Sequence, residues 1–353
     1  MVLVIALAAM LWGFGALIKV PHRARWTMIG LLYVFVLALQ VALPDDHPVR
    51  LATGESPAFW LILGGFAALV LGYRAVLRRL RGRAQQEEAK AAPAQSGPFS
   101  DTELNRYARH IVLREVGGAG QKALKDARVL VVGAGGLGSP ILQYLAGAGV
   151  GTIGVIDDDV VENTNLQRQI IHHDAQIGTP KVFSAQAAME AQNPFVSVRP
   201  YHRRLSAGIV DDLLGDYDLV IDGTDNFDTR YLVNAAAVRA GIPLISGALT
   251  QWEGQVSVFD PANDAPCYAC IFPQAQAPAA ELAPSCAEAG VIGPLPGVVG
   301  SMMAVEAVKI IIGAGTVLRG EMVIYDALYG ESRKISLKRR PDCTTCGSAV
   351  AAG

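Results

Sequence analysis

Two cations and a carboxylate in the middle of the chain are of the types that a reaction at a phosphate requires. Arg168 can clamp a phosphate with two parallel hydrogen bonds, and Lys181, at the start of a predicted helix, can place an ammonium against phosphate oxygens. Asp225 can hold Mg²⁺ beside a triphosphate. Together these side chains predict a site that binds a nucleotide and reacts at its phosphates.

A glycine-rich turn at 133–138 follows the apolar run 129–132 and leads into a predicted helix. Because glycines have no side chain, backbone N–H groups and the helix N-terminus can approach a phosphate chain. A second apolar run ends on Asp157, which is placed to accept hydrogen bonds from ribose hydroxyls. A third run leads to Asp225 and Asn226 at the carboxyl edge of the predicted sheet, where open α/β folds bind ligands.

Other interpretations of these residues exist. The glycine turn and Asp157 also suit an NAD(P)-dependent oxidoreductase, but such an enzyme has no use for Arg168 or Asp225. Taken singly, Arg168 could form a surface salt bridge, Lys181 could be solvated, and Asp225 could cap a helix. The three occur together beside a glycine turn, which favours the nucleotide site.

The cysteines predict a metal site. Cys267 and Cys270 form one C-x-x-C pair, Cys343 and Cys346 form another, and Cys286 stands alone. Such spacing in a chain with a nucleotide-binding fold indicates reduced, metal-binding thiols and not a disulfide framework. Four thiolates would form a closed, structural Zn²⁺ site, because no position stays open for water. Cys286 is either a plain loop cysteine or a thiol that forms a covalent intermediate.

The elements that position these residues alternate between β and α from residue 128 onward. This pattern predicts an α/β fold with a doubly wound, Rossmann-like sheet. Strands are expected at 128–132, 152–157, 195–199, 218–222 and 243–246, and helices at 138–148, 180–192 and 227–240. Additional C-terminal strands are expected at 255–259, 321–325 and 332–337, around an apolar helix at 298–312. A capping box at 100–103 predicts one more helix, which carries Arg109.

Three apolar stretches precede this unit, at 1–18, 26–43 and 58–77. Each is close to the ~20 residues that a helix needs to cross a membrane. The first has no basic start and no small-residue cleavage site, which argues against a signal peptide. We therefore expect residues 1–83 to form a membrane anchor with three transmembrane helices, residues 84–99 a flexible linker, and residues 100–353 the enzyme.

Charges indicate the orientation of the anchor. The connection between the first two spans and the segment after the third are basic, whereas the second connection is mostly acidic. Basic residues prefer the cytoplasmic side, so a multi-pass protein of the cell (inner) membrane with a cytoplasmic catalytic domain is expected. The overall net charge of −2 gives no reason to expect nucleic-acid binding.

In its motifs and their order the chain resembles the ThiF/MoeB/HesA family of ubiquitin-activating-enzyme-like adenylyltransferases, and within it the molybdopterin-synthase adenylyltransferase branch. The resemblance covers about residues 100–347. It implies that ATP is bound by Gly136, Asp157, Asn165, Arg168, Lys181, Asp225 and Asn226, with Asp225 on Mg²⁺. It also implies that Arg109 reaches into the partner subunit's site, which requires a homodimer, and that the four paired cysteines hold Zn²⁺.

The reaction that the resemblance implies is adenylylation of the C-terminal glycine carboxylate of a small ubiquitin-like sulfur carrier protein, MoaD-like or ThiS-like. The products would be an acyl-adenylate and pyrophosphate, for molybdopterin cofactor or thiamine biosynthesis. The carboxylate is already ionised, so catalysis is positioning and charge stabilisation by Arg109, Arg168, Lys181 and the Mg²⁺ on Asp225. Cys286 matches a cysteine that becomes acylated in some members, and a separate sulfur donor protein is expected. A non-catalytic scaffold that holds the carrier at the membrane is the remaining alternative.

Overall fold

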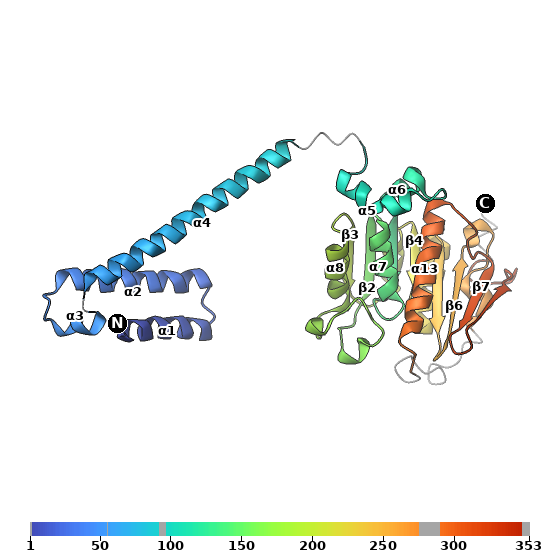
Figure 1. The fold of residues 1–353 in the computed structure, drawn as a ribbon. Coiled ribbons are helices and arrows are strands. Elements are labelled where there is room, and N and C mark those ends of the chain that lie inside the picture. The colour runs from blue at the N-terminus through green and yellow to red at the C-terminus, as the bar shows by residue number, and fades with distance from the viewer. Residues whose placement is uncertain (1, 55, 92–96, 275–289, 348–353) are drawn as a thin grey trace. The chain divides into compact units, whose positions relative to one another are not determined.

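The computed structural model describes residues 2–54, 56–91, 97–274 and 290–347 (Figure 1). The chain divides into two compact units, Met1–Ser96 and Gly97–Gly353.

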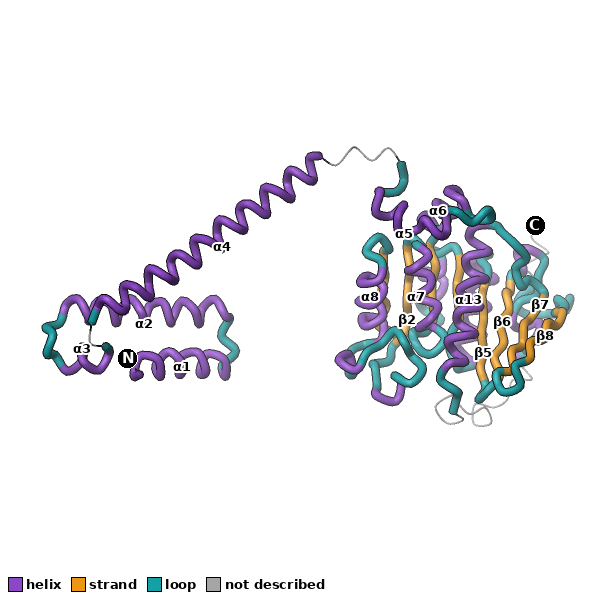
Figure 2. Tube along the Cα trace, viewed as in Figure 1, coloured by secondary structure: helices purple, strands orange, loops and turns teal. Residues whose placement is uncertain are grey.

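The second unit is built on one eight-stranded sheet with the order β3-β2-β1-β4-β5-β6-β7-β8 (Figure 2). The first five strands in this order are parallel, and β6, β7 and β8 are antiparallel additions. This confirms the predicted Rossmann-like sheet with C-terminal strands. The strand bounds are β1 Arg128–Val132, β2 Thr152–Asp157, β3 Ser197–His202, β4 Leu219–Asp222, β5 Leu244–Leu249, β6 Glu253–Phe259, β7 Glu321–Asp326 and β8 Glu331–Ser336.

Helices cover both faces of this sheet, and Figure 1 shows α7, α8 and α13 on one of them. Val129 and Val131 of β1 pack into one cluster with α7, α8 and α13, whereas Leu130 and Val132 pack into another with α9 and α10. Successive strand residues point to opposite faces, so an unbroken apolar run is what a sheet buried on both sides requires. The helix bounds are α5 Asp101–Ile111, α6 Gly117–Asp126, α7 Gly138–Ala148, α8 Lys181–Gln192, α9 Val210–Leu214, α10 Phe227–Ala240, α11 Tyr268–Ile271 and α13 Pro294–Ile312, with 3₁₀ turns at Asn163–Asn165, Asp174–Gln176 and Pro261–Asn263.

Several boundaries in this unit differ from the prediction by one to four residues, and two of these differences have a clear physical cause. β3 begins at Ser197 and not at 195, because residues 194–196, which start with Pro194, form a turn after α8. α13 begins at Pro294 and not at 298, because proline is well tolerated in the first turn of a helix. By length and composition α13 could cross a membrane, but Leu295, Val299 and Met303 are buried in the core of the sheet unit.

The first unit contains the three apolar helices that were predicted, with a short fourth helix between the last two. Their bounds are α1 Val2–Leu17, α2 His22–Ala42, α3 Pro48–Thr53 and α4 Pro57–Ala91. A small cluster of Val4, Val36 and Trp60 joins α1, α2 and α4. α2 and the part of α4 up to Leu80 are long and apolar enough to cross a membrane, whereas α1 is shorter, with 16 residues.

The prediction of a flexible linker at 84–99 is wrong over its first half, because α4 continues to Ala91. Residues 84–91 consist of Ala, Gln, Glu and Lys, which are strong helix formers, and the first proline comes only at Pro93. Residues 92–96 lie outside the described part of the chain. The capping box that opens α5 is confirmed: the backbone N–H of Glu103 donates to Ser100 Oγ at 3.3 Å, and that of Ser100 to the Glu103 carboxylate at 2.9 Å.

Candidate nucleotide cleft and cysteine cluster

A cleft of about 910 Å³ lies at the carboxyl ends of the parallel strands of the sheet unit. In the sheet, β2 and β3 lie on one side of β1, and β4 and β5 lie on the other. The cleft therefore lies at the point where the strand order reverses. Open α/β sheets bind ligands at this point. All the residues expected to bind ATP line the cleft: Gly136, Asp157, Asn165, Arg168, Lys181, Asp225 and Asn226.

Two positions of the glycine turn at one end of the cleft, Gly133 and Gly138, require glycine. Gly133 has a φ of +96°, in the left-handed region that side chains disfavour. A Cβ on Gly138 would lie 2.0 Å from the carbonyl oxygen of Gly133, which is far inside van der Waals contact. α7 therefore starts directly against the turn, and its N-terminus carries the partial positive charge that favours a phosphate.

Asp157 holds the glycine turn against the end of β2. One carboxylate oxygen accepts a hydrogen bond from the backbone N–H of Ala134 at 2.7 Å, and the other accepts from that of Asp159 at 2.9 Å. A carboxylate has about four acceptor positions, so these bonds leave capacity for ribose hydroxyls. Sequence reasoning anticipated the ribose role of Asp157 but not its part in holding the turn.

Lys181 and Arg168 lie in the cleft in different environments. The side chain of Lys181 is only 7 % exposed, and its Nζ is 2.6 Å from the carboxylate of Asp159, which is 65 % exposed. The interpretation of Lys181 as a solvated surface lysine is therefore wrong. Arg168 is half-buried and donates to the carbonyl of Thr164 at 3.1 Å, and it forms no ion pair with any described residue. Its guanidinium is not committed to a carboxylate.

The side chains of Asn165 and Asn226 accept hydrogen bonds from backbone N–H groups of the cleft loops, whereas Asp225 is exposed on the cleft wall. Asn165 is buried, and its Oδ1 accepts from the backbone N–H of Glu162 at 3.1 Å. Asn226 caps α10, because its Oδ1 accepts from the N–H of Thr229 at 2.9 Å. The alternative reading of Asp225 as a helix cap is therefore wrong. Asp225 is exposed on the cleft wall, and an exposed carboxylate there suits a Mg²⁺ ligand.

Two buried charged residues hold the loop that carries Asp225 against the sheet. Neither of them has a role predicted from the sequence. Asp222 is fully buried, and one of its oxygens accepts from the N–H and hydroxyl of Thr224 at 2.9 and 2.7 Å. Arg230 is also buried and donates to the carbonyls of Thr224 and Gly247, the second at 2.7 Å. The loop is thus tied to both β4 and β5. The signal available in the sequence was a charged residue at the end of an apolar strand.

A buried histidine links the glycine turn to α8. His172 Nε2 is 2.9 Å from the carbonyl oxygen of Ala134, and its Nδ1 is 2.7 Å from the hydroxyl of Ser184. A carbonyl oxygen can only accept, so Nε2 carries the proton. Burial lowers the pKa of His172, which keeps the imidazole neutral near pH 7. The residue joins the turn to the helix that begins with Lys181.

The structure does not place two of the predicted catalytic residues, Arg109 and Cys286, in the cleft: one lies elsewhere and the other is not described. Arg109 is exposed on α5 and does not line the cleft of its own chain. This placement is compatible with a role in a second subunit, which stays a prediction. Cys286 lies outside the described residues, so its covalent role also stays a prediction.

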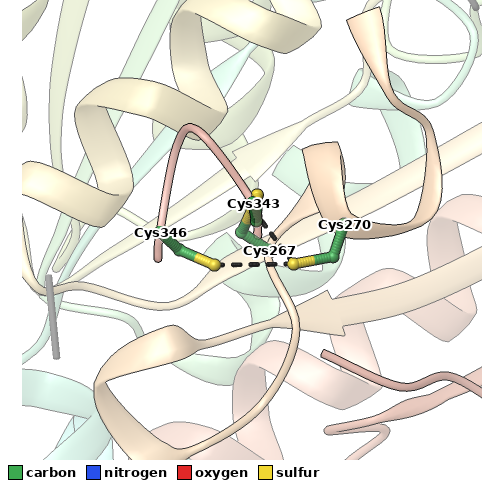
Figure 3. A group of neighbouring side chains, drawn as sticks. All are labelled: Cys267, Cys270, Cys343 and Cys346. Atoms are coloured by element: carbon green, nitrogen blue, oxygen red, sulfur yellow. Dashed lines mark hydrogen bonds between the residues drawn. The ribbon is translucent and has the colours of Figure 1, made fainter. Parts of the chain in front are cut away.

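The four paired cysteines come together from distant parts of the chain, as predicted (Figure 3). All are buried and free, and neighbouring sulfur atoms lie 3.5–3.8 Å apart. Tetrahedral zinc with Zn–S bonds of about 2.3 Å requires sulfurs about 3.8 Å apart, so the cluster fits Zn²⁺. Burial raises the pKa of Cys267 and Cys270, so a cation is needed to stabilise their thiolates. Hydrogen bonds outweigh burial at Cys343 and lower its pKa to about 7.

The fold is similar to solved structures. E. coli MccB with MccA-N7isoASN aligns with a TM-score of 0.59 at 22 % identity, over 71 % of this chain and 76 % of that one. PaaA aligns with a TM-score of 0.60 at 23 % identity, over 74 % of this chain and 83 % of that one. At this identity the likeness establishes the fold alone.

Relatives found by sequence have a higher identity to this chain than these solved structures. The sulfur carrier protein adenylyltransferase of Thermus thermophilus is 50 % identical over 253 residues, which is 70 % of this chain and 93 % of the relative. The molybdopterin-synthase adenylyltransferase of Salmonella typhimurium is 46 % identical over 249 residues, which is 70 % of this chain and 98 % of the relative. The ThiF family model matches residues 107–345. With the sheet order, the cleft and these relatives in agreement, the chain belongs to the ThiF family.

Proposed function

We propose that this protein uses ATP to adenylylate the C-terminal carboxylate of a small ubiquitin-like sulfur carrier protein. The observation that carries the proposal is that Arg168, Lys181 and Asp225 meet a glycine turn in one cleft at the switch point of the sheet. The relatives named as sulfur carrier protein and molybdopterin-synthase adenylyltransferases support the same reaction. The carrier belongs to molybdopterin or thiamine biosynthesis.

In the reaction, a carboxylate oxygen of the carrier attacks the α-phosphorus of ATP, and the bond from that phosphorus to the pyrophosphate oxygen breaks. The carboxylate is ionised at neutral pH, so no general base is needed. The glycine turn and the start of α7 receive the phosphates, while Lys181 and Arg168 neutralise the charge that gathers around the α-phosphorus. Asp225 would hold Mg²⁺, which screens the outer phosphates when it is bound.

Two further parts of the proposal concern assembly. The cysteine cluster holds Zn²⁺ and ties the C-terminal segment to α11. The active form is a homodimer in which Arg109 enters the partner's cleft. An apolar groove on α7 and α13 supports this, because Tyr144 and Val305 are 60 % and 56 % exposed there.

We also propose that α2 and α4 cross the cell membrane and place the ThiF unit in the cytoplasm, with α1 completing the anchor. Only 11 % of the apolar window of α2 and 6 % of that of α4 is buried within the protein. Exposing this much apolar surface to water is unfavourable, whereas lipid tails solvate it well. The basic residues after the apolar part of α4 favour the cytoplasmic side.

Carrier-dependent exchange of labelled pyrophosphate into ATP tests the function. Arg168→Ala and Asp225→Ala should each lower the exchange rate on the order of 100-fold or more, because each removes charge stabilisation at the reacting phosphates. Arg128→Ala is the matched control, since Arg128 forms only a surface ion pair with Asp218. It should keep the wild-type rate. A wild-type protein that reduces NAD(P)⁺ and shows no exchange would overturn the proposal in favour of an oxidoreductase.

A further inference from the structure

The two ends of the N-terminal helical unit differ in charge. α2 and α4 are joined through α3, and the connection between α1 and α2 lies at the opposite end of α2 (Figure 1). We call the α1–α2 connection together with the far end of the apolar part of α4 the basic end; its described cations are Lys19, Arg23, Arg25, Arg74, Arg78 and Arg79. The end at α3 carries Asp45, Asp46 and Arg50.

The cation at the α3 end is neutralised within the protein, and those at the basic end are not. Arg50 lies 2.7 Å from the carboxylate of Asp45 and donates to the carbonyl of Leu43 at 2.7 Å. None of the basic-end cations forms an ion pair with a described residue. The sequence explains why, because it has no acidic residue before Asp45 and none between Glu55 and Glu87.

Distance along α4 separates the arginines from the next carboxylate. Arg78 and Arg79 are exposed, and Glu87 comes two turns of helix later, about 12 Å along the axis. That gap exceeds the reach of a direct ion pair. Among the described residues of the N-terminal unit, none therefore supplies a counter-ion to Arg78 and Arg79.

Aromatic side chains place the basic end at the level of lipid headgroups. Trp12 and Trp26 pack edge to face with ring centroids 5.0 Å apart, and the guanidinium of Arg25 lies 5.7 Å from the Trp12 ring. Trp26 is 64 % exposed, and tryptophan concentrates at the membrane interface. The apolar part of α4 is about 30 Å long up to residue 77, so Arg78 and Arg79 come where the hydrocarbon ends.

We propose that the basic end is a binding surface for anionic phospholipid headgroups. Arginine binds a phosphate with two parallel hydrogen bonds, and juxtamembrane basic clusters are attracted to anionic leaflets. The phosphate of a zwitterionic headgroup is already neutralised by the cation of the same headgroup, so it does not neutralise the arginines of the basic end. The inference rests on the membrane anchoring proposed above. It goes beyond anchoring, because the basic end would select anionic lipids over zwitterionic ones.

Tryptophan quenching by brominated lipids tests the preference in the full chain reconstituted into vesicles. The replacements Trp60→Phe and Trp252→Phe leave Trp12 and Trp26 as the fluorophores, so the emission reports the basic end. Brominated phosphatidylglycerol should quench several-fold more effectively than brominated phosphatidylcholine at the same mole fraction. The double variant Arg78→Gln and Arg79→Gln should abolish most of the difference. High salt should reduce the difference in the parent protein.

The charge-matched control carries Arg114→Gln and Arg239→Gln, two exposed arginines of the ThiF unit, and should keep the full preference. Equal quenching by the two lipids, or a preference that survives the Arg78 and Arg79 changes, overturns the headgroup site while leaving the anchor intact. Absence of quenching by either lipid overturns the anchor itself, and the headgroup site with it.

Discussion

At the scale of single residues, the cleft is prepared for phosphates by contacts that ATP can replace at small cost. Lys181 is almost buried and pairs with Asp159, but the Asp159 carboxylate is 65 % exposed. An ion pair with an exposed partner contributes about 0–1 kcal/mol, so a phosphate can displace Asp159 from Lys181 readily. The helix start and the pair with Asp159 keep the ammonium in the cleft until then.

Buried His172 predicts a loss of stability in acid. Burial lowers its pKa in the folded state, whereas the unfolded chain has a pKa near 6.5. Below about pH 6.5 the unfolded state binds the proton more readily than the folded state. The contribution of His172 is therefore complete above that pH and is lost as the pH falls through the lowered folded value. The melting temperature of the full chain in detergent should fall more steeply below pH 6.5 than that of His172→Asn.

His202 provides the control for this measurement, because it is exposed at the end of β3. His202→Asn should reproduce the wild-type pH dependence. A His172→Asn protein whose melting temperature follows the wild-type slope would show that the acid loss comes from other groups.

At the scale of elements, the sequence predicted best where burial leaves little choice. β1, β2 and β4 follow from unbroken apolar runs, and α7 follows from the glycine turn. The helices α6 and α9 were not anticipated, because α9 is only five residues long and α6 starts at two glycines. The contacts Lys181–Asp159 and Arg230–Gly247 could not be predicted either, since they depend on which strand ends become neighbours.

The close packing at the start of α7 predicts that one added methyl group at Gly138 lowers the stability of the protein. Gly138→Ala places a Cβ 2.0 Å from the Gly133 carbonyl oxygen, which is backbone and cannot rotate away. The turn or the helix must shift, at a cost of about 1–3 kcal/mol. We expect a lower melting temperature and weaker ATP binding, measured by calorimetry. Gly208→Ala is the control, because nothing lies within 4 Å of the added carbon. An unaffected Gly138→Ala protein would refute the close approach.

The cysteine cluster predicts a bound metal with a structural role. Metal analysis of the purified chain should give about one Zn²⁺ per chain, because four thiolates complete its coordination. Cys343→Ser should lose the metal and lower the melting temperature, since it removes a ligand that joins the C-terminal segment to α11. Cys286→Ser removes a thiol that belongs to neither C-x-x-C pair and should keep the zinc. A stable, folded protein without zinc would contradict the site.

At the scale of the whole molecule, the two units differ in how much of their apolar surface they bury. The ThiF unit buries its apolar residues in a sheet core, whereas the helices of the first unit leave theirs largely exposed. α4 continues as a helix well past its apolar part and ends at Ala91. α13 is the instructive contrast: its composition is as apolar as that of α2, yet it packs against α7 and the sheet.

The topology of the anchor can be tested with two reporters. If α2 and α4 cross the membrane with the basic end inside, a reporter after Gly353 is shielded from protease added to intact cells, and a protease site inserted at Asp46 is cleaved. The physical cause is the cost of moving unpaired arginines across the bilayer, which Arg50 avoids through its pair with Asp45. Replacing Arg78, Arg79, Arg81 and Arg83 by glutamine should therefore expose the C-terminal reporter in part of the population. Cleavage of that reporter in the unmodified protein would reverse the orientation, and protection at both positions would mean that the helices do not span.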